Sequence, residues 1–139
     1  MIKKRYTDVK EEQVTDYGSQ LTTIRWLITK ENDGAPRFAM RRFEILPGGS
    51  IGMHHHPQEH EIYFLEGEGE VFNENETVKV EAGDVLYVPP EEPHGYKNTG
   101  DRPLVFICVI PYLNSACAYS AFCYSCSLNY SLCFLFFLY

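Results

Sequence analysis

Short β-rich segments separated by turn residues dominate the chain between residues 21 and 111. Seven runs are rich in β-branched and aromatic residues and lack helical periodicity. We expect strands at 21–29, 37–46, 62–65, 69–72, 77–80, 84–88 and 104–110. Clusters of Gly, Pro, Asn and Asp separate these runs, as at 47–49 and 73–75. Many short strands with regular turns are typical of a sandwich or barrel, and a double-sheet jelly roll is one such closure. The sequence therefore predicts an all-β fold.

The length and charge of the chain limit its organisation and partners. Its 139 residues suffice for one domain with a buried core. The formal net charge is −7, and the basic residues form no run longer than residues 3–5. Nucleic acid is not an expected partner, because phosphate binding needs a concentrated basic face. The N-terminus lacks the apolar stretch of a signal peptide, so we expect a cytoplasmic protein.

Composition divides the chain into three segments. Residues 1–20 carry no clear pattern, and we expect an N-terminal arm on a partner subunit or an edge strand. Residues 21–113 contain all the predicted strands and form the barrel domain. Residues 114–139 are an uncharged tail rich in Cys, Ser and Phe that we place outside this domain. Four of the five cysteines lie in this tail, so they are no disulfide framework for the barrel.

Three interpretations of the tail compete. A membrane anchor needs about 20 predominantly apolar residues, but serines and an asparagine dilute this stretch until its last eight residues. A cysteine metal site would need a second C-x2-C pair beside the one at residues 123–126. We therefore expect a non-functional appendage, and a membrane is not an expected partner.

All five histidines lie in or beside two β-rich segments, four of them within residues 54–60. Residues two apart in a strand share a face, so His54 and His56 point together while His55 points away. Pro57 interrupts the strand and turns the chain, which lets His60 return to the same point. His94 supplies a fourth imidazole. Four histidines in this arrangement predict one bound divalent transition metal ion.

The same residues resemble the cupins, whose two motifs read G-x5-H-x-H-x3,4-E-x6-G and G-x5-P-x-G-x2-H-x3-N. The matching positions are Gly48, His54, His56 and Gly67 in the first motif and Gly83, Pro89, His94 and Asn98 in the second. The resemblance covers about residues 37–111. It implies a single-domain cupin jelly-roll barrel (a double-stranded β-helix), a metal site, and a homodimer.

Two positions depart from the family pattern. The count from His56 and back from Gly67 places His60, rather than a glutamate, at the acidic ligand position. We expect a four-histidine site, although the alternative four-residue spacing would make Glu61 the ligand. The second departure is Glu91, which stands where the family usually has glycine and indicates a slightly different turn.

A ligand set of four neutral imidazoles leaves the ion its full 2+ charge, which favours anionic ligands and acidifies a bound water. The resemblance implies Mn(II) or Fe(II), and ligation by imidazole also suits zinc, nickel, copper or cobalt. Four protein ligands on an octahedral ion leave two positions for water or substrate, whereas tetrahedral zinc would have none.

Four further residues are candidates for a substrate pocket. Phe106 and Cys108 share one face of the last predicted strand, and Tyr63 and Arg41 lie on strands near the ligands. Tyrosines also serve as packing in β-rich cores. The Arg41-Arg42 pair is more easily explained as one solvated and one partly inward residue than as an anion site. We expect an oxygenase-type enzyme, or a related isomerase, that acts on a small organic molecule. The alternative is a non-catalytic module that senses or stores a ligand, because one fold carries many functions.

Overall fold

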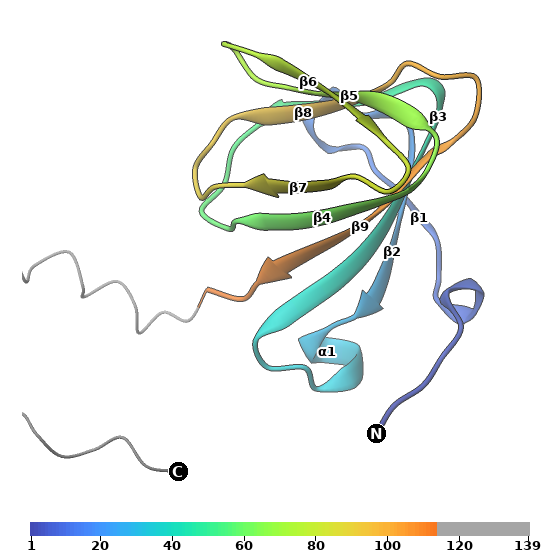
Figure 1. The fold of residues 1–139 in the computed structure, drawn as a ribbon. Helices are drawn as coiled ribbons and strands as arrows, with labels where there is room; N and C mark the ends of the chain where they lie inside the picture. Colours follow the sequence, from blue (N-terminus) through green and yellow to red (C-terminus); the bar gives the residue numbers. More distant parts are fainter. Residues whose placement is uncertain (114–139) are drawn as a thin grey trace, which may run out of the picture.

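The computed structural model describes residues 1–113, and the predictions for the tail lie outside the described residues. Within these residues nine strands form one curled sheet in the order β6-β5-β8-β3-β9-β4-β7, with β2 on β3 and β1 on β2 (Figure 1). The strands are β1 Glu12–Gln13, β2 Gln20–Ile28, β3 Phe38–His54, β4 His60–Glu66, β5 Glu68–Phe72, β6 Thr77–Glu81, β7 Val85–Val88, β8 His94–Asn98 and β9 Leu104–Pro111. Among residues 1–113, helical structure is limited to α1 (Lys30–Asp33) and the 3₁₀ turns η1 (Tyr6–Asp8) and η2 (Asp16–Gly18).

Strand β3 departs most from the sequence-based prediction. We expected a strand at 37–46 and a turn at 47–49, but β3 continues through that turn to His54. Its first part pairs with β2 and β9, and its last part pairs with β8. Gly48 lies at the bend with φ 77°, a backbone conformation that glycine adopts without steric cost. The predicted turn is therefore a bend inside one strand, and this bend joins the two halves of the sheet.

The curl of the sheet closes the barrel. Every strand pair is antiparallel, as in β3 with β9 and in β5 with β8. Strand β4 also contacts β6, although four strands separate them in the sheet order. Figure 1 shows β5, β6 and β8 opposite β4 and β7 across the interior. The all-β jelly-roll prediction is confirmed.

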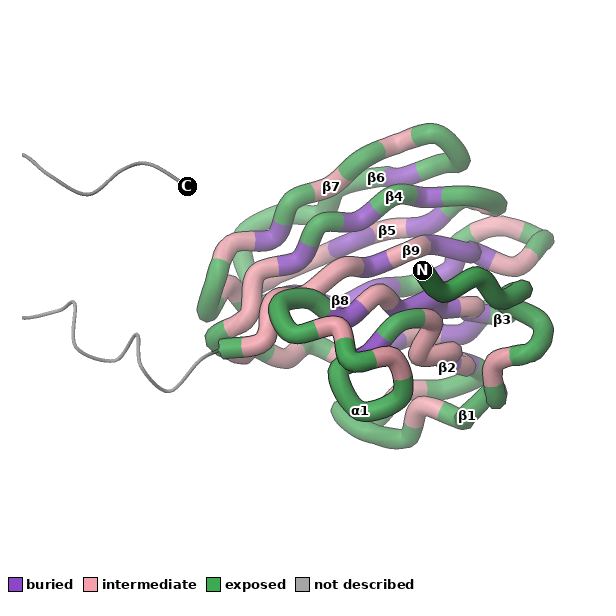
Figure 2. Tube along the Cα trace, turned by 90° about the horizontal axis from the view of Figure 1, so that it is seen from below, coloured by how far each residue is buried: buried purple, intermediate pink, exposed green. Residues whose placement is uncertain are grey.

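The core fills the inner face of this barrel. Buried and exposed residues alternate along β4 (Figure 2). Ile62 and Phe64 are among its buried residues, so their side chains face the core. Phe106 occupies the centre, with ring centroids 5.1 Å from Phe43, 5.3 Å from Phe64 and 5.2 Å from Tyr96. Burying one such aromatic side chain contributes about 1.5–3 kcal/mol. This aromatic cluster adjoins the histidines.

Asn98, a match to the second sequence motif, has a structural role. Its side-chain amide donates to the carbonyl oxygens of Ile45 at 2.7 Å and Arg102 at 2.8 Å. Its side-chain oxygen accepts from the N–H of Gly100 at 2.9 Å. Asn98 is 2% exposed, and these three bonds satisfy most of its hydrogen-bonding capacity. The asparagine fixes the turn between β8 and β9 and takes no part in the histidine cluster.

The N-terminal segment packs on the barrel. Strand β1 pairs with β2, and the Arg25 guanidinium on β2 donates to the Val9 carbonyl oxygen and, at 2.8 Å, to the Glu11 carboxylate. The following turn η2 contacts β3. In the described part of the chain, residues 1–113, no helix has the length and apolarity needed to cross a membrane.

Candidate metal centre

Three of the four predicted ligands lie at strand ends. His54 ends β3, His60 begins β4 and His94 begins β8. His54 and His94 are partners in the β3–β8 pair, so their rings share one face with centroids 4.4 Å apart. His56 lies two residues beyond the end of β3, because the chain leaves the sheet before Pro57, which has no N–H to donate. The strand alternation that we expected for His54 and His56 therefore stops at His54.

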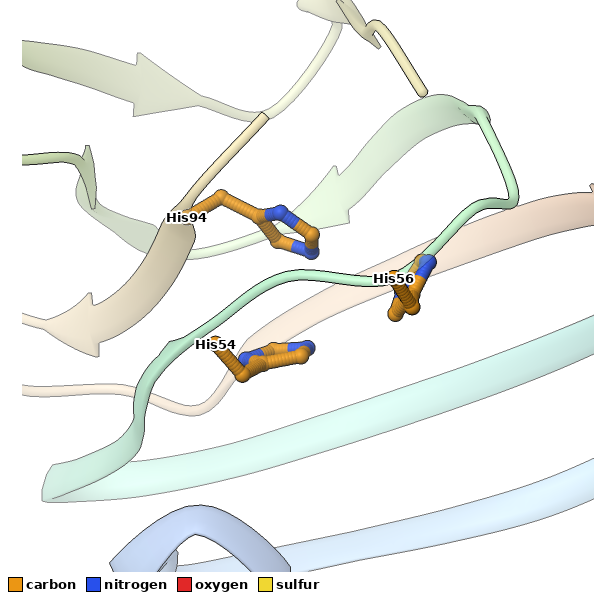
Figure 3. Close-up of side chains that lie close together, drawn as sticks. All are labelled: His54, His56 and His94. Carbon is orange, nitrogen blue, oxygen red and sulfur yellow. The ribbon is translucent and has the colours of Figure 1, made fainter. Parts of the chain in front are cut away.

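The imidazoles of His54, His56 and His94 form a compact group (Figure 3). Each offers one ring nitrogen, and the three nitrogens all lie within 4.8 Å of one another. His94 is buried and the other two are partly buried. The structure therefore brings together three of the four histidines in a group that could hold a metal ion.

His60 lies directly beside this group. Its Nε2 is 2.8 Å from Nε2 of His56, and its ring centroid is 4.8 Å from that of His94. Two nitrogens this close must share either a proton or an ion. Ligands on one octahedral ion at bond lengths of about 2.0–2.1 Å lie roughly 2.9 Å apart. The separation between His56 and His60 fits the second case as well as the first.

Hydrogen bonds leave ligand nitrogens free to bind. The Nδ1 atoms of His54 and His94 lie 2.9 Å and 2.8 Å from the carbonyl oxygens of Gly52 and Glu92. Because a carbonyl oxygen only accepts, these Nδ1 atoms donate and the Nε2 atoms carry lone pairs. Nε2 of His94 is buried without a hydrogen-bond partner among the described residues. Histidines that bind metals commonly have this arrangement, so the residues fit a divalent ion.

The environment keeps these imidazoles neutral. Burial, together with the nearby Arg41 charge, lowers the pKa of His60 to about 2. Burial also lowers the pKa of His94 to about 4, and the pKa values of His54 and His56 are lowered for the same first reason. Neutral imidazole is the form that binds a metal ion. The cluster is therefore ready for a cation near neutral pH.

His55 and Glu91 lie outside the cluster and join two of its segments. His55 faces solvent, with Nδ1 3.2 Å from the Glu91 carboxylate. The Glu91 N–H donates to the His56 carbonyl oxygen at 2.9 Å. Glu91 has φ 63°, in the left-handed region that favours glycine. This contact ties the loop that carries His56 to the turn that precedes His94.

A cavity of about 310 Å³ opens beside the histidines. Arg41, Phe106 and Cys108, three of the predicted pocket residues, line it together with His54, His56 and His60. Tyr63, the fourth, does not. It is 49% exposed, because the alternation of β4 turns Ile62 and Phe64 inward and Tyr63 outward. This places Tyr63 on the outer surface, and it corrects the expectation that it faces the pocket.

The N-terminal segment supplies cavity residues that sequence reasoning missed. Glu12, Asp16 and Tyr17 line the cavity, and the ring of Tyr17 stacks on His54. Nothing in the local pattern of residues 1–20 indicates this position. The available signal was Gly52 inside a strand, because such a glycine often marks a close approach by another backbone. A Cβ at Gly52 would lie 2.0 Å from the Tyr17 carbonyl oxygen.

Comparison with known proteins identifies the family. Residues 41–110 match the family model of the cupin domain. The chain belongs to the cupin family. This cupin is 34% identical over 111 residues to the oxalate-binding protein of Thermotoga maritima, covering 76% of this chain and 90% of that protein. It is also 34% identical over 103 residues to the polyketide synthase CurC of Streptomyces cyaneus, covering 73% of this chain and 65% of that protein.

A solved structure supports the same assignment. The polyketide cyclase RemF from Streptomyces resistomycificus superimposes on this cupin with a TM-score of 0.74 at 36% identity, covering 83% of this chain and 88% of that one. The names of these relatives refer to oxalate in one case and to polyketides in the others. Family membership therefore supports a metal-binding cupin and does not select a substrate.

Proposed function

We propose that this cupin holds one divalent transition metal ion with His54, His56, His60 and His94. The main support is Nε2 of His94, which is buried and has no hydrogen-bond partner in the described part of the chain, while its Nδ1 donates to a carbonyl oxygen. The three-histidine group supplies three of the ligands. The fourth is His60, whose Nε2 lies 2.8 Å from that of His56.

Tyr96 supports the assignment of His60 as a ligand. Its hydroxyl lies 3.2 Å from Nδ1 of His60 and leaves Nε2 directed at His56. Tyr96 is itself 2% exposed, which fixes the orientation of the ring next to it. Glu61, the alternative ligand, is exposed on the opposite face of β4. The residues therefore favour four imidazoles over three imidazoles and a carboxylate, with Mn(II) or Fe(II) as the expected ion.

We further propose that the protein is an enzyme of the oxygenase type, or a related isomerase, that acts on a small organic molecule in the adjacent cavity. A redox-active ion would supply dioxygen activation, and any divalent ion would polarise an enol or carboxyl oxygen. The chain itself binds and orients the molecule through the cavity walls. Glu12 and Asp16 place carboxylates at the cavity, where they could accept a proton. The similarity to a polyketide cyclase is consistent with a substrate that contains enols or phenols.

The second candidate is a non-catalytic module that binds a small ligand at the same ion. The similarity to an oxalate-binding protein, which covers 90% of that relative, favours this alternative. Both candidates use the same histidines and the same cavity. They differ only in whether the bound molecule changes.

Oxygen uptake separates these candidates. The full chain is loaded with Fe(II), Mn(II) or Zn(II) and incubated with a panel of phenols, enols and diketones, and oxygen consumption and product mass are measured. We expect uptake with iron or manganese and none with redox-silent zinc. The His56→Ala variant removes a ligand and should abolish the uptake, whereas His55→Ala removes an exposed imidazole and should preserve it.

Three other results would overturn the oxygenase proposal, and each has a different meaning. Product formation without oxygen consumption, including with zinc, would establish isomerisation or cyclisation. Tight binding of an unchanged compound without turnover would establish the binding module. Uptake that persists in His56→Ala would mean that the reaction does not use this site.

A further inference from the structure

Within residues 1–113, Arg41 is a buried cation without a counter-ion. Arg41 is 9% exposed, and its side chain lines the cavity beside the histidines. Nη2 donates to Sγ of Cys108 at 2.9 Å, and Nε is buried without a hydrogen-bond partner in this part of the chain. Among residues 1–113 no carboxylate oxygen lies within the 4.0 Å of an ion pair with Arg41. An unpaired buried charge is costly, and proteins usually pair such a charge or bind a ligand to it.

Arg42, the next residue of the same strand, is a buried arginine that is paired with a carboxylate. It is 8% exposed, its Nη1 lies 2.9 Å from the Glu44 carboxylate, and its guanidinium lies 4.7 Å from the Tyr6 ring centroid. Alternation turns the two arginines to opposite faces of β3. Of these two buried arginines, only Arg41, which faces the cavity, lacks a carboxylate partner among the described residues.

The groups around Arg41 do not cancel its charge. Burial raises the pKa of Cys108, so the thiol that accepts from Arg41 stays neutral at pH 7. The centroids of the Trp26 and Phe43 rings lie 5.6 Å and 5.2 Å from the guanidinium carbon, and such contacts are attractive but add no negative charge. Glu12 and Asp16 line the same cavity but are exposed, and Glu12 pairs with Lys10 at 3.0 Å. The inner part of the cavity is therefore positive even without a metal ion.

Apolar side chains form much of the remaining wall. Ile24, Trp26, Phe43, Ile51 and Phe106 line the same space as Arg41. A volume of about 310 Å³ lies at the lower end of the range for sites that take organic ligands. Such a site suits a molecule with an apolar or aromatic body and one charged end.

We propose that the cavity binds a small aromatic or enolic acid whose carboxylate pairs with Arg41 while its body packs on the apolar walls. This proposal deepens the proposed function, because the same molecule would reach the histidine-bound ion with an oxygen donor. The planar guanidinium matches a carboxylate with two parallel hydrogen bonds, which a neutral ligand would not form.

Calorimetry with matched probes tests this inference. The full chain is loaded with Co(II), whose absorption spectrum reports coordination, and is titrated with 2-hydroxybenzoate and 2-hydroxybenzamide. These probes share a ring and a hydroxyl and differ in charge. We expect the acid to bind at least about tenfold more tightly than the amide, since one charge-assisted pair contributes roughly 1.5–3 kcal/mol. Acetate, which lacks the ring, should bind at least about tenfold more weakly than 2-hydroxybenzoate.

Arginine variants assign the preference to Arg41 rather than to the ion. In Arg41→Met the preference for the acid should fall at least about tenfold, to what the charge of the ion alone supplies, with the cobalt spectrum unchanged, and Arg41→Lys should recover part of it. Arg42→Met is the matched control and should keep the full preference. An undiminished preference in Arg41→Met would place the carboxylate on the ion alone and overturn the inference, as would equal affinity for acetate and 2-hydroxybenzoate. Failure to bind cobalt at all would instead contradict the proposed metal site.

Discussion

The phenol ring of Tyr17 lies on the imidazole of His54, with ring centroids 4.1 Å apart and 10° between the planes. Tyr17 has φ 56°, a left-handed conformation that is uncommon for a residue with a side chain. Its carbonyl oxygen approaches Gly52, whose own carbonyl oxygen accepts from Nδ1 of His54 at 2.9 Å. The N-terminal segment, the end of β3 and the first histidine are therefore held in one contact.

Substitution of Gly52 should disturb this contact. In Gly52→Ala the new Cβ would lie 2.0 Å from the backbone oxygen of Tyr17, so the N-terminal segment must move away. We expect metal affinity to fall about tenfold, as when a residue that orients a metal ligand is lost. We also expect the free energy of unfolding to fall by about 1–3 kcal/mol. Competition with a chelator and urea unfolding measure the two effects.

Gly100→Ala is the control for this substitution. Its Cβ would meet only the flexible Glu68 side chain, with Cγ at 2.7 Å, far from the histidines. We expect unchanged metal affinity. Equal losses of affinity in the two variants would show that the Tyr17 contact does not support the site.

Removal of His60 tests the fourth ligand. We expect His60→Ala to lose metal affinity by much more than His55→Ala, because His60 is 4% exposed beside His56 while the His55 side chain is 67% exposed. Metal content after dialysis, measured by elemental analysis, provides the comparison. Full occupancy in His60→Ala would reduce the site to the three-histidine group, and equal losses in both variants would refute the distinction between inward and outward imidazoles.

Tyr96→Phe tests the support of that ligand. The variant removes the hydroxyl that lies 3.2 Å from Nδ1 of His60 and keeps the ring that stacks 5.2 Å from Phe106. We expect metal affinity to fall about tenfold, the lower end for loss of a hydrogen bond to a ligand. Because the ring remains, the stability of the metal-free protein should change little. A large loss of stability with unchanged affinity would make Tyr96 a packing residue only.

Acid should destabilise the metal-free protein through the same histidines. In the unfolded chain a histidine has a pKa of about 6.5, whereas in the fold burial lowers that of His94 to about 4 and that of His60 to about 2. The unfolded chain therefore binds more protons below about pH 6.5, so the free energy of unfolding falls as the pH is lowered toward 4. Urea midpoints at about pH 7 and about pH 4.5 measure this decrease.

A variant identifies the groups responsible for this decrease. His94→Gln cannot take up the proton, so its stability should depend less steeply on pH than that of the wild type, whereas His55→Ala should match the wild type. Stability that rises on acidification would contradict the sign of the argument.

The sequence predicted the elements of the barrel better than their connection. Runs of β-branched and aromatic residues between turn signals located β4 to β7 and β9 to within a few residues, because strand and turn residues differ locally in composition. The extension of β3 through Gly48 to His54 was not predicted. Judged by its local sequence, Pro-Gly-Gly predicts a turn. The residues that follow it pair with β8, which is distant in sequence, and this pairing keeps the segment within one strand.

The same distinction holds at the site. The spacing of the histidines predicted that His54, His56 and His94 would lie close together. The reason is that the sheet itself fixes the positions of residues near the ends of its strands. The positions of Tyr17, Glu12 and Asp16 at the cavity follow from contacts of the N-terminal segment with β2 and β3, so no local pattern reports them. Tyr63 was placed by proximity in sequence, and the alternation of β4 alone would have turned it outward.

Elemental analysis of the full chain, purified without added metal, tests whether the histidines hold an ion. We predict about one divalent transition metal ion per chain, manganese or iron, and a loss of most of that metal in His56→Ala and in His94→Ala, since each removes a nitrogen of the three-histidine group. A wild-type protein that carries no such ion, and takes none up from manganese, iron or zinc solutions, would contradict the account. Unchanged metal content in both variants would contradict it equally.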